Sequence, residues 1–186
     1  MIIGLGHRSG HGKDLSGSYM VQWARENTNL RVTKLSWAWK LKDVCYQLYG
    51  HLGLKEADFY DTDEGRALRN IRLPKINLSA VEIWVKMGTN GVREQVWDRT
   101  WIEWVCAQQE KYDVIICPDT RFHNEIELCD HTVKITNPRV PNREGISVDE
   151  VLADYNDWNY YLMNDGDKAK LKERSISIIR DIIHYV

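Results

Sequence analysis

The sequence has little net charge, because 25 lysine and arginine residues are balanced by 27 aspartate and glutamate residues, leaving −2 at pH 7. This balance offers no general attraction to nucleic acid or to an anionic membrane, so we expect neither as a partner. Long apolar runs are also missing, since the opening MIIGL is far too short for a signal peptide or a membrane span. We therefore expect a soluble protein of the cytoplasm.

Cysteine is sparse, and its four copies form no CxxC pair. Cys45, Cys106, Cys117 and Cys129 lie in apolar segments, where a reduced cysteine behaves as a small hydrophobic residue. This usage favours a reducing compartment. Repeats are absent, and one stretch alone, TNPRVPNREGIS at 136–147, is rich enough in proline and glycine to predict a flexible loop.

Tryptophan, in contrast, is abundant, with eight residues. Trp97, Trp101 and Trp104 recur at i, i+4 and i+7, which is helical spacing. Aromatic platforms for nucleic-acid bases normally accompany a basic groove, which the balanced charge does not favour. We therefore interpret these tryptophans as one packed helix face.

Short apolar segments alternate with helical patterns along the chain. The segments MIIGL, VTKLSW, DVIICP, HTVKIT and WNYYLM predict about five strands. Helices are expected at 14–26, 37–51, 78–93, 98–111, shortly after 119, and 167–184. This alternation predicts an α/β fold, a three-layer sandwich whose central, mainly parallel sheet carries helices on both faces. The length suits a single domain, 1–186.

The stretch GHRSGHGKD, from Gly6 to Asp14, lies between the first predicted strand and the first predicted helix. Phosphate loops follow the pattern GxxxxGK plus Ser or Thr, in which backbone N–H groups wrap the phosphates and the lysine adds a charge. Gly12 and Lys13 match the end of that pattern. Its first glycine falls on His7, so either the loop has one extra residue or His7 replaces the glycine.

We predict that this loop binds a phosphate, because it follows a strand and opens a helix as the mechanism requires. An ordinary glycine-rich turn, with Asp14 at the favourable start of a helix, is the alternative. His7 and His11 have no third ligand nearby in the sequence and are interpreted as loop residues rather than a metal site. The residues predicted to contact the phosphate-bearing ligand are Gly6, His7, Arg8, Ser9, Gly10, His11, Gly12, Lys13 and Asp14.

The segment DVIICPDTRFHNE places polar residues directly after a buried-looking strand. Asp119 is predicted to hold Mg²⁺, directly or through water, or to orient the attacking group, and Arg121 to clamp a phosphate. The structural alternative is that Asp119 starts the next helix and Arg121 pairs with Glu125. For Asn124 and Glu125 both interpretations stay open.

The stretch VKMGTNGVRE interrupts a helical pattern with Gly88 and with Asn90 and Gly91. These residues are unfavourable inside a helix and predict a turn, with N–H groups and Arg93 available for an anion. A plain connection between two helices is the alternative.

The loop 136–147 carries Arg139 and Arg143. Arginines on such a loop can close over a transferring phosphoryl group and stabilise its charge, so we predict a lid. The alternative is a solvated surface loop.

Taken together, these motifs resemble the bacteriophage deoxynucleoside monophosphate kinase family, a branch of the P-loop nucleotide kinases. The matching pieces are GHRSGHGKD, SWAWKLKD, MGTNGVRE, PDTRFHNE and LMNDGDKAKL, in order over nearly the whole chain. Many enzymes share the phosphate loop, whereas DTRFHNE together with GTNGVRE is far more specific. Aspartate after Gly-Lys is also what the family looks like, which accounts for Asp14.

The resemblance implies transfer of the γ-phosphoryl group of ATP to a deoxynucleoside monophosphate, with Mg²⁺. Asp14 and Asp119 would position the metal, and the adenine would lie near Asn164 and Gly166. The catalytic residues would be Lys13, Asp119, Arg121, Arg139 and Arg143. The acceptor would be bound by Lys42, Gly88, Thr89, Arg93, Arg121, Asn124 and Glu125.

The implied organisation is a monophosphate-binding helical region at about 37–97 and a lid at about 136–147. The partner would be a small nucleotide, the protein a monomer or homodimer, and the location the host cytoplasm if the chain comes from a phage. Two other functions stay open: a P-loop kinase of another phosphorylated metabolite, and an ATP-binding switch without turnover. The many arginines disfavour the switch, which has less need of a second phosphate site.

Overall fold

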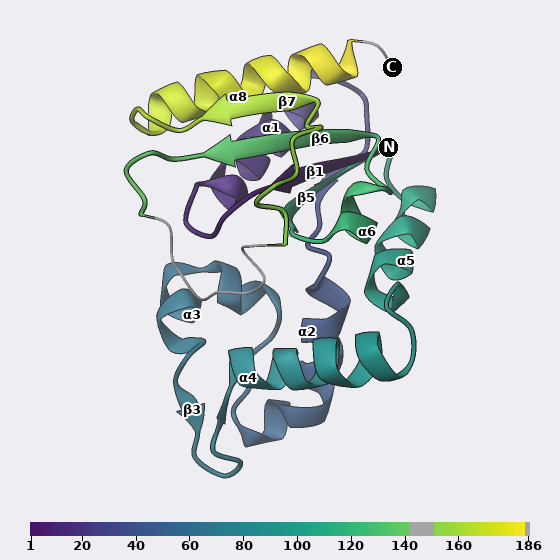
Figure 1. Ribbon diagram of the computed structural model, residues 1–186, viewed down its shortest axis with the longest axis vertical. Helices are drawn as coiled ribbons and strands as arrows, with labels where there is room; N and C mark the ends of the chain where they lie inside the picture. The colour runs from purple at the N-terminus through teal and green to yellow at the C-terminus, as the bar shows by residue number, and fades with distance from the viewer. Residues whose placement is uncertain (142–150, 185–186) are drawn as a thin grey trace. The chain divides into compact units, whose positions relative to one another are not determined.

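The computed structural model describes residues 1–141 and 151–184 of the chain (Figure 1). Within them, five parallel strands form a sheet in the order β2-β5-β1-β6-β7. The strands are β1 (Ile2–Gly6), β2 (Val32–Lys34), β5 (Val114–Thr120), β6 (His131–Thr136) and β7 (Tyr160–Met163). The predicted parallel sheet of about five strands is thereby confirmed.

Strand β1 lies at the centre of the sheet, and all five of its residues are buried. Its last residue, Gly6, is in register with Thr120 of β5 on one side and with Lys134 of β6 on the other. After β1 the chain adds strands first on one side and then on the other, so β1 marks a topological switch point. Ligands of open parallel sheets bind at the carboxyl edge beside such a point.

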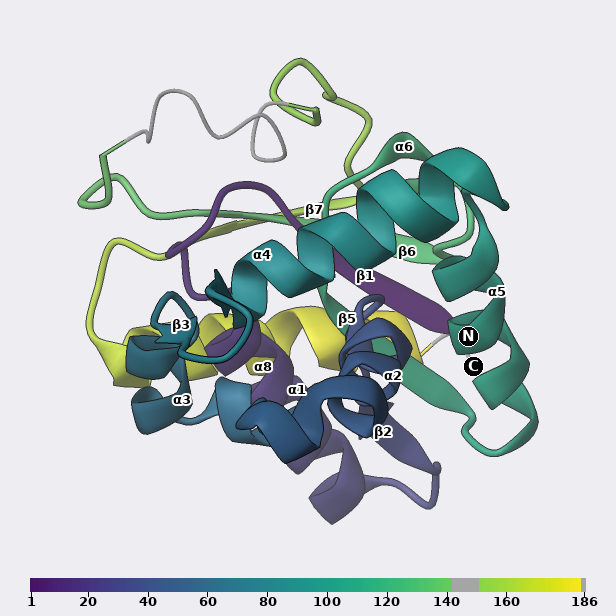
Figure 2. The ribbon, with the colours of Figure 1, turned by 90° about the horizontal axis from the view of Figure 1, so that it is seen from below.

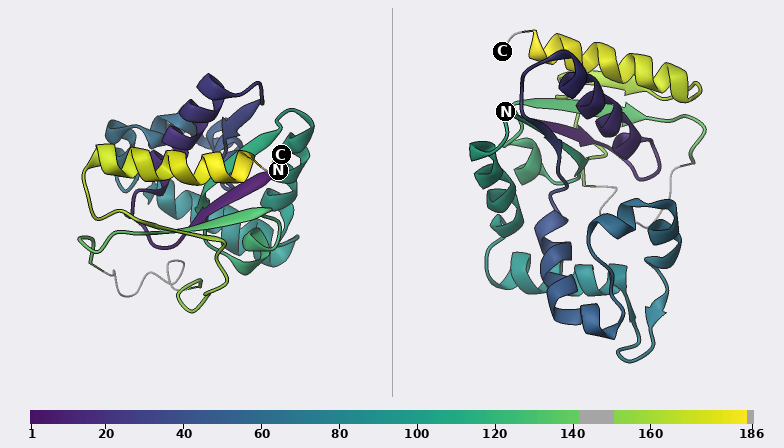
Figure 3. Two further views of the ribbon diagram at one scale, coloured as in Figure 1. Left: turned by 90° about the horizontal axis from the view of Figure 1, so that it is seen from above. Right: turned by 180° about the vertical axis from the view of Figure 1, so that it is seen from behind.

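Two long helices cover one face of the sheet. They are α1 (Lys13–Asn27) and α8 (Lys168–Ile183), which lie side by side in Figure 3. Both pack on a buried core that includes Ile3, Leu5 and Val133 from the strands. Apolar residues of the central strands therefore point toward these helices.

The other face of the sheet carries shorter segments, with α6 (His123–Ile126) on the side away from α1 and α8 (Figure 2). A small buried cluster of Ile126, Leu152 and Trp158 covers this face. Gly6 of β1 lies beneath it, because a Cβ on Gly6 would lie 2.1 Å from the Trp158 ring. Helical and loop layers on both faces of the sheet complete the predicted three-layer α/β sandwich.

The chain divides into two compact units: unit 1 comprises Met1–Ser36 and Val105–Val186, and unit 2 comprises Trp37–Trp104. Unit 2 has its own core, which includes Leu41, Cys45 and Ile83. Its elements are α2 (Trp39–Tyr49), α3 (Asp63–Leu68), β3 (Arg72–Leu73), β4 (Leu78–Ser79), α4 (Ala80–Trp84), a π-helix (Val85–Arg93) and 3₁₀ turns at Gly50–Leu52 and Asp58–Asp61. Helix α5 (Thr100–Ala107) and a 3₁₀ turn at Gln108–Glu110 return the chain to unit 1.

The predicted helices agree with the structure to within a few residues at their ends. The predicted helix 14–26 is α1, and the predicted helix 167–184 is α8. The predicted helices 37–51 and 98–111 each end in a 3₁₀ turn. Across the described ranges, no helix is both long enough and apolar enough to cross a membrane.

The predicted turn at Gly88 and Asn90–Gly91 is wrong, because Val85–Arg93 is a continuous π-helix. Gly88 is buried, and a Cβ there would lie 2.2 Å from Cδ2 of Leu41 on α2. The indole N–H of Trp101 donates to the Gly88 carbonyl at 3.3 Å. This glycine therefore permits close helix packing and does not reverse the chain.

The interpretation of the three tryptophans as one packed face is wrong for Trp97, which is 51% exposed. Trp101 packs on the core of unit 2, and Trp104 stacks on Trp39 with ring centroids 5.3 Å apart. Helix α5 begins at Thr100, so the helical spacing does not extend back to Trp97.

Candidate functional site

The loop His7–Gly12 joins the carboxyl end of β1 to the amino end of α1. His7 (φ 88°), Gly10 (φ 82°) and Gly12 (φ 98°) have left-handed backbone. Glycine adopts this conformation readily, whereas a residue with a Cβ loses about 1–2 kcal/mol. His7, on which the first glycine of the pattern falls, therefore has a left-handed backbone despite its Cβ.

Lys13 begins α1 and is 6% exposed. Its Nζ donates to the carbonyl oxygens of His7 at 2.9 Å and Arg8 at 2.6 Å. Helix α1 receives no side-chain cap from its N-cap residue, Gly12, so its first-turn N–H groups keep the tendency to attract an anion. The ammonium and the helix start therefore concentrate positive charge at the loop.

The loop is braced by the segments that follow β6 and β7. The Asn164 side-chain amide donates to the His11 carbonyl at 3.1 Å, and the backbone N–H of Asn137 donates to His11 Nδ1 at 3.2 Å. The backbone N–H of Asn164 donates to the Thr136 carbonyl at 2.7 Å, which joins the two strand ends. A Cβ on Gly12 would lie 2.7 Å from Asn164 Nδ2, so the bracing is tight.

The pKa of His7 reports the positive charge around the loop. Burial and the positive charge of Lys134, followed by the effects of His11, Arg8 and Lys13, lower the pKa of His7 to about 4. His7 is therefore neutral at pH 7, and its Nδ1 is buried without a hydrogen-bond partner in the described part of the chain. Cationic groups gathered around one loop favour the binding of an anion.

Asp119 lies on β5, one residue before Thr120, which is in register with Gly6 at the start of the loop. The Ser36 hydroxyl, just beyond β2, donates to Asp119 Oδ2 at 2.5 Å. This bond fixes the orientation of a half-buried carboxylate at the carboxyl edge of the sheet. Asp14, in the first turn of α1, is exposed.

No group of three or more His, Cys, Asp or Glu side chains able to hold a metal ion is found among the described residues. Asp14 and Asp119 do not form a closed protein cage for a cation. Mg²⁺ commonly binds one or two carboxylates and completes its shell with phosphate oxygens and water. The half-buried carboxylate of Asp119 at the carboxyl edge of the sheet is a donor of the type that such a site uses.

Glu125 has a clear structural role in the turn after β5. It is 4% exposed, and its Oε2 accepts the backbone N–H groups of Arg121 at 2.7 Å and Phe122 at 3.1 Å. Arg121 and Asn124 belong to the same segment of the chain, and both are half-buried. Glu125 thus shapes the segment that presents Arg121.

Arg139 follows β6 and contacts the segment after β7. Its guanidinium donates to the Gly166 carbonyl, and its backbone N–H donates to Asn137 Oδ1 at 3.0 Å. Asn164 and Gly166, predicted near the adenine, therefore lie with Arg139 and the loop in unit 1. Arg143 lies outside the described residues.

The remaining predicted residues belong to unit 2. Lys42 on α2 has its Nζ 3.8 Å from Asp61 Oδ1 and 5.2 Å from the centroid of the Trp84 ring. Gly88, Thr89 and Arg93 lie on the π-helix, which packs on α2 through Gly88. Unit 2 therefore holds these four residues on two adjoining helices.

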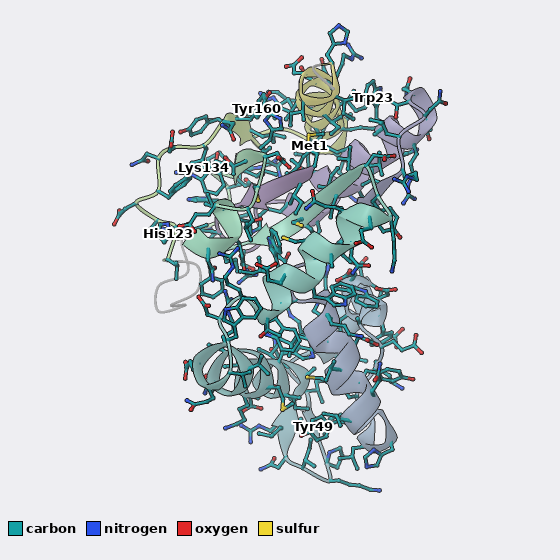
Figure 4. All side chains as sticks on the ribbon, turned by 90° about the vertical axis from the view of Figure 1, so that its right-hand side faces the viewer. Met1, Trp23, Tyr49, His123, Lys134 and Tyr160 are labelled. Carbon is teal, nitrogen blue, oxygen red and sulfur yellow. The ribbon has the colours of Figure 1, made fainter. Side chains whose placement is uncertain are left out.

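Two residues of unit 1 were not predicted for the site. Lys134 on β6 lies on the opposite side of the sheet from Trp23 (Figure 4), and it contributes to the low pKa of His7. Ser36 holds Asp119. The sequence signal for Lys134 was a charged residue between the apolar Val133 and Ile135 of a predicted strand. Ser36 gave no signal, because its partner lies 83 residues away in the chain.

No family model matches the chain, and no curated protein matches it. Among solved structures, a dephospho-CoA kinase from Campylobacter jejuni is similar, with 11% identity, coverage of 97% of this chain and 96% of that chain, and a TM-score of 0.44. Identity and score at this level say nothing about activity. The features that bear on activity are therefore the loop, its lysine and the groups that surround them.

Proposed function

We propose that this chain is an ATP-dependent kinase that transfers the γ-phosphoryl group of ATP to a deoxynucleoside monophosphate. The observation that carries the proposal is the loop His7–Gly12, with Lys13 buried against it at the carboxyl end of the central strand. The choice of acceptor rests on the resemblance of the sequence motifs.

Lys13 and the N–H groups of Ser9 to Lys13 bind the β- and γ-phosphates of ATP in this proposal. The ammonium exchanges the carbonyl oxygens of His7 and Arg8 for phosphate oxygens, which carry more negative charge. Gly6, Gly10 and the other loop residues bring the backbone close enough for N–H contacts.

Asp119 and Asp14 hold Mg²⁺, partly through water. The metal, when bound, neutralises charge on the phosphate oxygens. The hydroxyl of Ser36 keeps the Asp119 carboxylate oriented.

The nucleoside end of ATP is bound by Asn164, Gly166 and Arg139. The Arg139 guanidinium donates to the Gly166 carbonyl. This contact supports the assignment, because it places the planar cation of Arg139 at the segment that also contains Asn164. Arg121, Arg139 and Arg143 stabilise the charge that develops on the transferring group.

The acceptor monophosphate is bound by Lys42, Thr89 and Arg93 of unit 2. Gly88 acts there through packing on Leu41, and Asn124 and Glu125 shape the turn that carries Arg121. An oxygen of the acceptor phosphate attacks the γ-phosphorus, and the bond from that phosphorus to the bridging oxygen of ADP breaks. The acceptor is already a nucleophile, so alignment and charge neutralisation are the main tasks of the protein.

The test is ADP formation with ATP and Mg²⁺ against deoxy- and ribonucleoside monophosphates, phosphomevalonate, dephospho-CoA and no acceptor. Strong stimulation by a deoxynucleoside monophosphate supports the proposal and ranks the bases. Stimulation only by a non-nucleoside-monophosphate acceptor indicates the metabolite kinase, and ATP binding without stimulated turnover indicates the switch.

The matched variants are Lys13→Ala and Lys168→Ala. Loss of the buried ammonium is expected to reduce turnover on the order of 10²-fold or more. Lys168 is exposed at the start of α8, so its variant keeps normal turnover. Near-normal turnover of a folded Lys13→Ala protein contradicts the site assignment.

A further inference from the structure

His11 lies where three segments of unit 1 meet. It is 4% exposed, although histidine is polar and the residue belongs to a loop. Its Nδ1 accepts the backbone N–H of Asn137 at 3.2 Å, and its carbonyl accepts the Asn164 side-chain amide at 3.1 Å. The His11 side chain thus contacts the end of β6, and its backbone contacts the end of β7.

The hydrogen bonds continue from Asn137 to Arg139. Asn137 Oδ1 accepts the backbone N–H of Arg139 at 3.0 Å, and the Arg139 guanidinium donates to the Gly166 carbonyl. An unbroken series of contacts therefore runs from the phosphate-binding loop through His11 and Asn137 to Arg139.

The side chain of His11 provides a connection that the neighbouring backbone does not. The bond from the Asn164 N–H to the Thr136 carbonyl joins β6 to β7 but leaves the loop out. The Asn164 side chain reaches the loop only from the β7 side. The bond to His11 Nδ1 therefore ties Asn137 itself to the loop.

We propose that His11 is a positioning residue, whose Nδ1 fixes the segment Asn137–Arg139 to the loop and thereby sets the position of the Arg139 guanidinium on Gly166. The part of this inference that concerns the nucleotide rests on the proposed function. Phosphate contacts in the loop and contacts of Arg139 with the rest of ATP then depend on one another, and such a coupling is reciprocal.

The first experiment measures backbone amide hydrogen exchange in the nucleotide-free protein and its variants. In His11→Leu the Asn137 N–H loses its acceptor, so exchange at Asn137 and Arg139 accelerates about tenfold or more. In His11→Asn the side-chain Oδ1 replaces Nδ1 at the same number of bonds from Cβ, so protection returns. His51→Leu, a change of an exposed histidine in unit 2, leaves both amides unchanged.

Unchanged exchange at Asn137 and Arg139 in His11→Leu overturns the proposal, as does equal acceleration in His11→Leu and His11→Asn. The latter result means that His11 only fills space. This experiment needs no ATP, so it decides on the positioning role even if the chain is not a kinase.

The second experiment measures the kinetics with ATP and the best acceptor. We expect His11→Leu to raise the KM for ATP about tenfold with a much smaller change in kcat, and His11→Asn to restore most of it. Equal losses in kcat for both variants contradict the role of His11 in positioning Arg139. Absence of turnover in the unchanged protein contradicts the proposed function instead, and leaves the exchange result as the test of the coupling.

Discussion

Glycine serves one purpose in the loop His7–Gly12 of unit 1 and another in the π-helix Val85–Arg93 of unit 2. In the loop, Gly10 and Gly12 have φ angles of 82° and 98°, which residues with a Cβ rarely adopt. In the π-helix, Gly88 is helical and buried, and the space for its missing Cβ is filled by Leu41. The first two glycines supply a backbone conformation, and the third supplies space.

This difference follows from how each unit is built. In unit 1 the sheet fixes the place where β1 ends, and the chain must reorient within six loop residues to begin α1. In unit 2 short helices pack on one another through side chains, so the limit is the distance between helices. The same substitution, glycine to alanine, is therefore resisted by torsional strain in the loop and by steric contact in the π-helix.

The largest effect on stability is expected for Gly12→Ala, where both kinds of resistance combine. The left-handed backbone and the contact of 2.7 Å with Asn164 Nδ2 lower the free energy of unfolding by about 3 kcal/mol. Urea unfolding measures the change.

The matched control is Gly53→Ala in unit 2. Gly53 has φ 107°, but its Cβ would meet Leu73 at an ordinary 3.5 Å. Its substitution therefore reports torsional strain alone, about 1 kcal/mol. If both substitutions lower the free energy of unfolding equally, the contact with Asn164 does not add to the cost of Gly12→Ala.

A second change, His7→Gly, relieves the left-handed strain and also removes a titrating group. The pKa of His7 is about 4 in the folded chain against 6.5 ordinarily, because burial and nearby cations disfavour its charged form. Between those pH values the unfolded chain binds more protons, so wild-type stability falls as pH drops from 6.5 toward 4. The variant lacks this loss.

We expect His7→Gly to exceed wild-type stability by about 1 kcal/mol at pH 7.5 and about 2 kcal/mol at pH 5, with the pH-dependent part reduced because His7 is half-exposed. Asn77→Gly is the control from unit 2, since Asn77 has φ 52° and does not titrate. Its gain stays constant with pH. A constant gain for His7→Gly as well contradicts the low pKa.

The third change, Gly88→Ala, is expected to lower the free energy of unfolding by about 1 kcal/mol, although alanine favours an ordinary helix. The cause is the contact of 2.2 Å between the new Cβ and Leu41 Cδ2. In a Leu41→Ala background the same change no longer destabilises, and a double-mutant cycle in urea measures the coupling. Additive effects show that the two residues do not contact as described.

The two units also differ in how far the sequence predicts them. The strands and long helices of unit 1 were predicted closely, because short apolar segments and helical periodicity report directly on burial in a sheet sandwich. In unit 2 the turn predicted at Gly88 was wrong, because the sequence does not distinguish a glycine required for close packing from a glycine required for a turn.

Long-range contacts limited the prediction of the site. The loop and Lys13 follow from a local pattern, whereas the bond from Ser36 to Asp119 and that from Asn137 to His11 join residues 83 and 126 positions apart. Strand order brings these pairs together, and a single sequence does not determine strand order. Residue roles that depend on such contacts, including that of His11, therefore required the structure.

The smallest effect is expected for Lys134→Met, which tests whether the positive charge around the loop His7–Gly12 extends to β6. After burial, Lys134 has the largest effect on the low pKa of His7. Its loss raises that pKa by a fraction of a unit toward the ordinary 6.5, which a proton NMR titration of the His7 ring detects. Lys34→Met is the matched control, because Lys34 lies on β2 and its Nζ donates to Ser18. An equal shift in both variants indicates a general charge effect, whereas a shift confined to Lys134→Met means that a strand lysine adds to the positive charge of the loop.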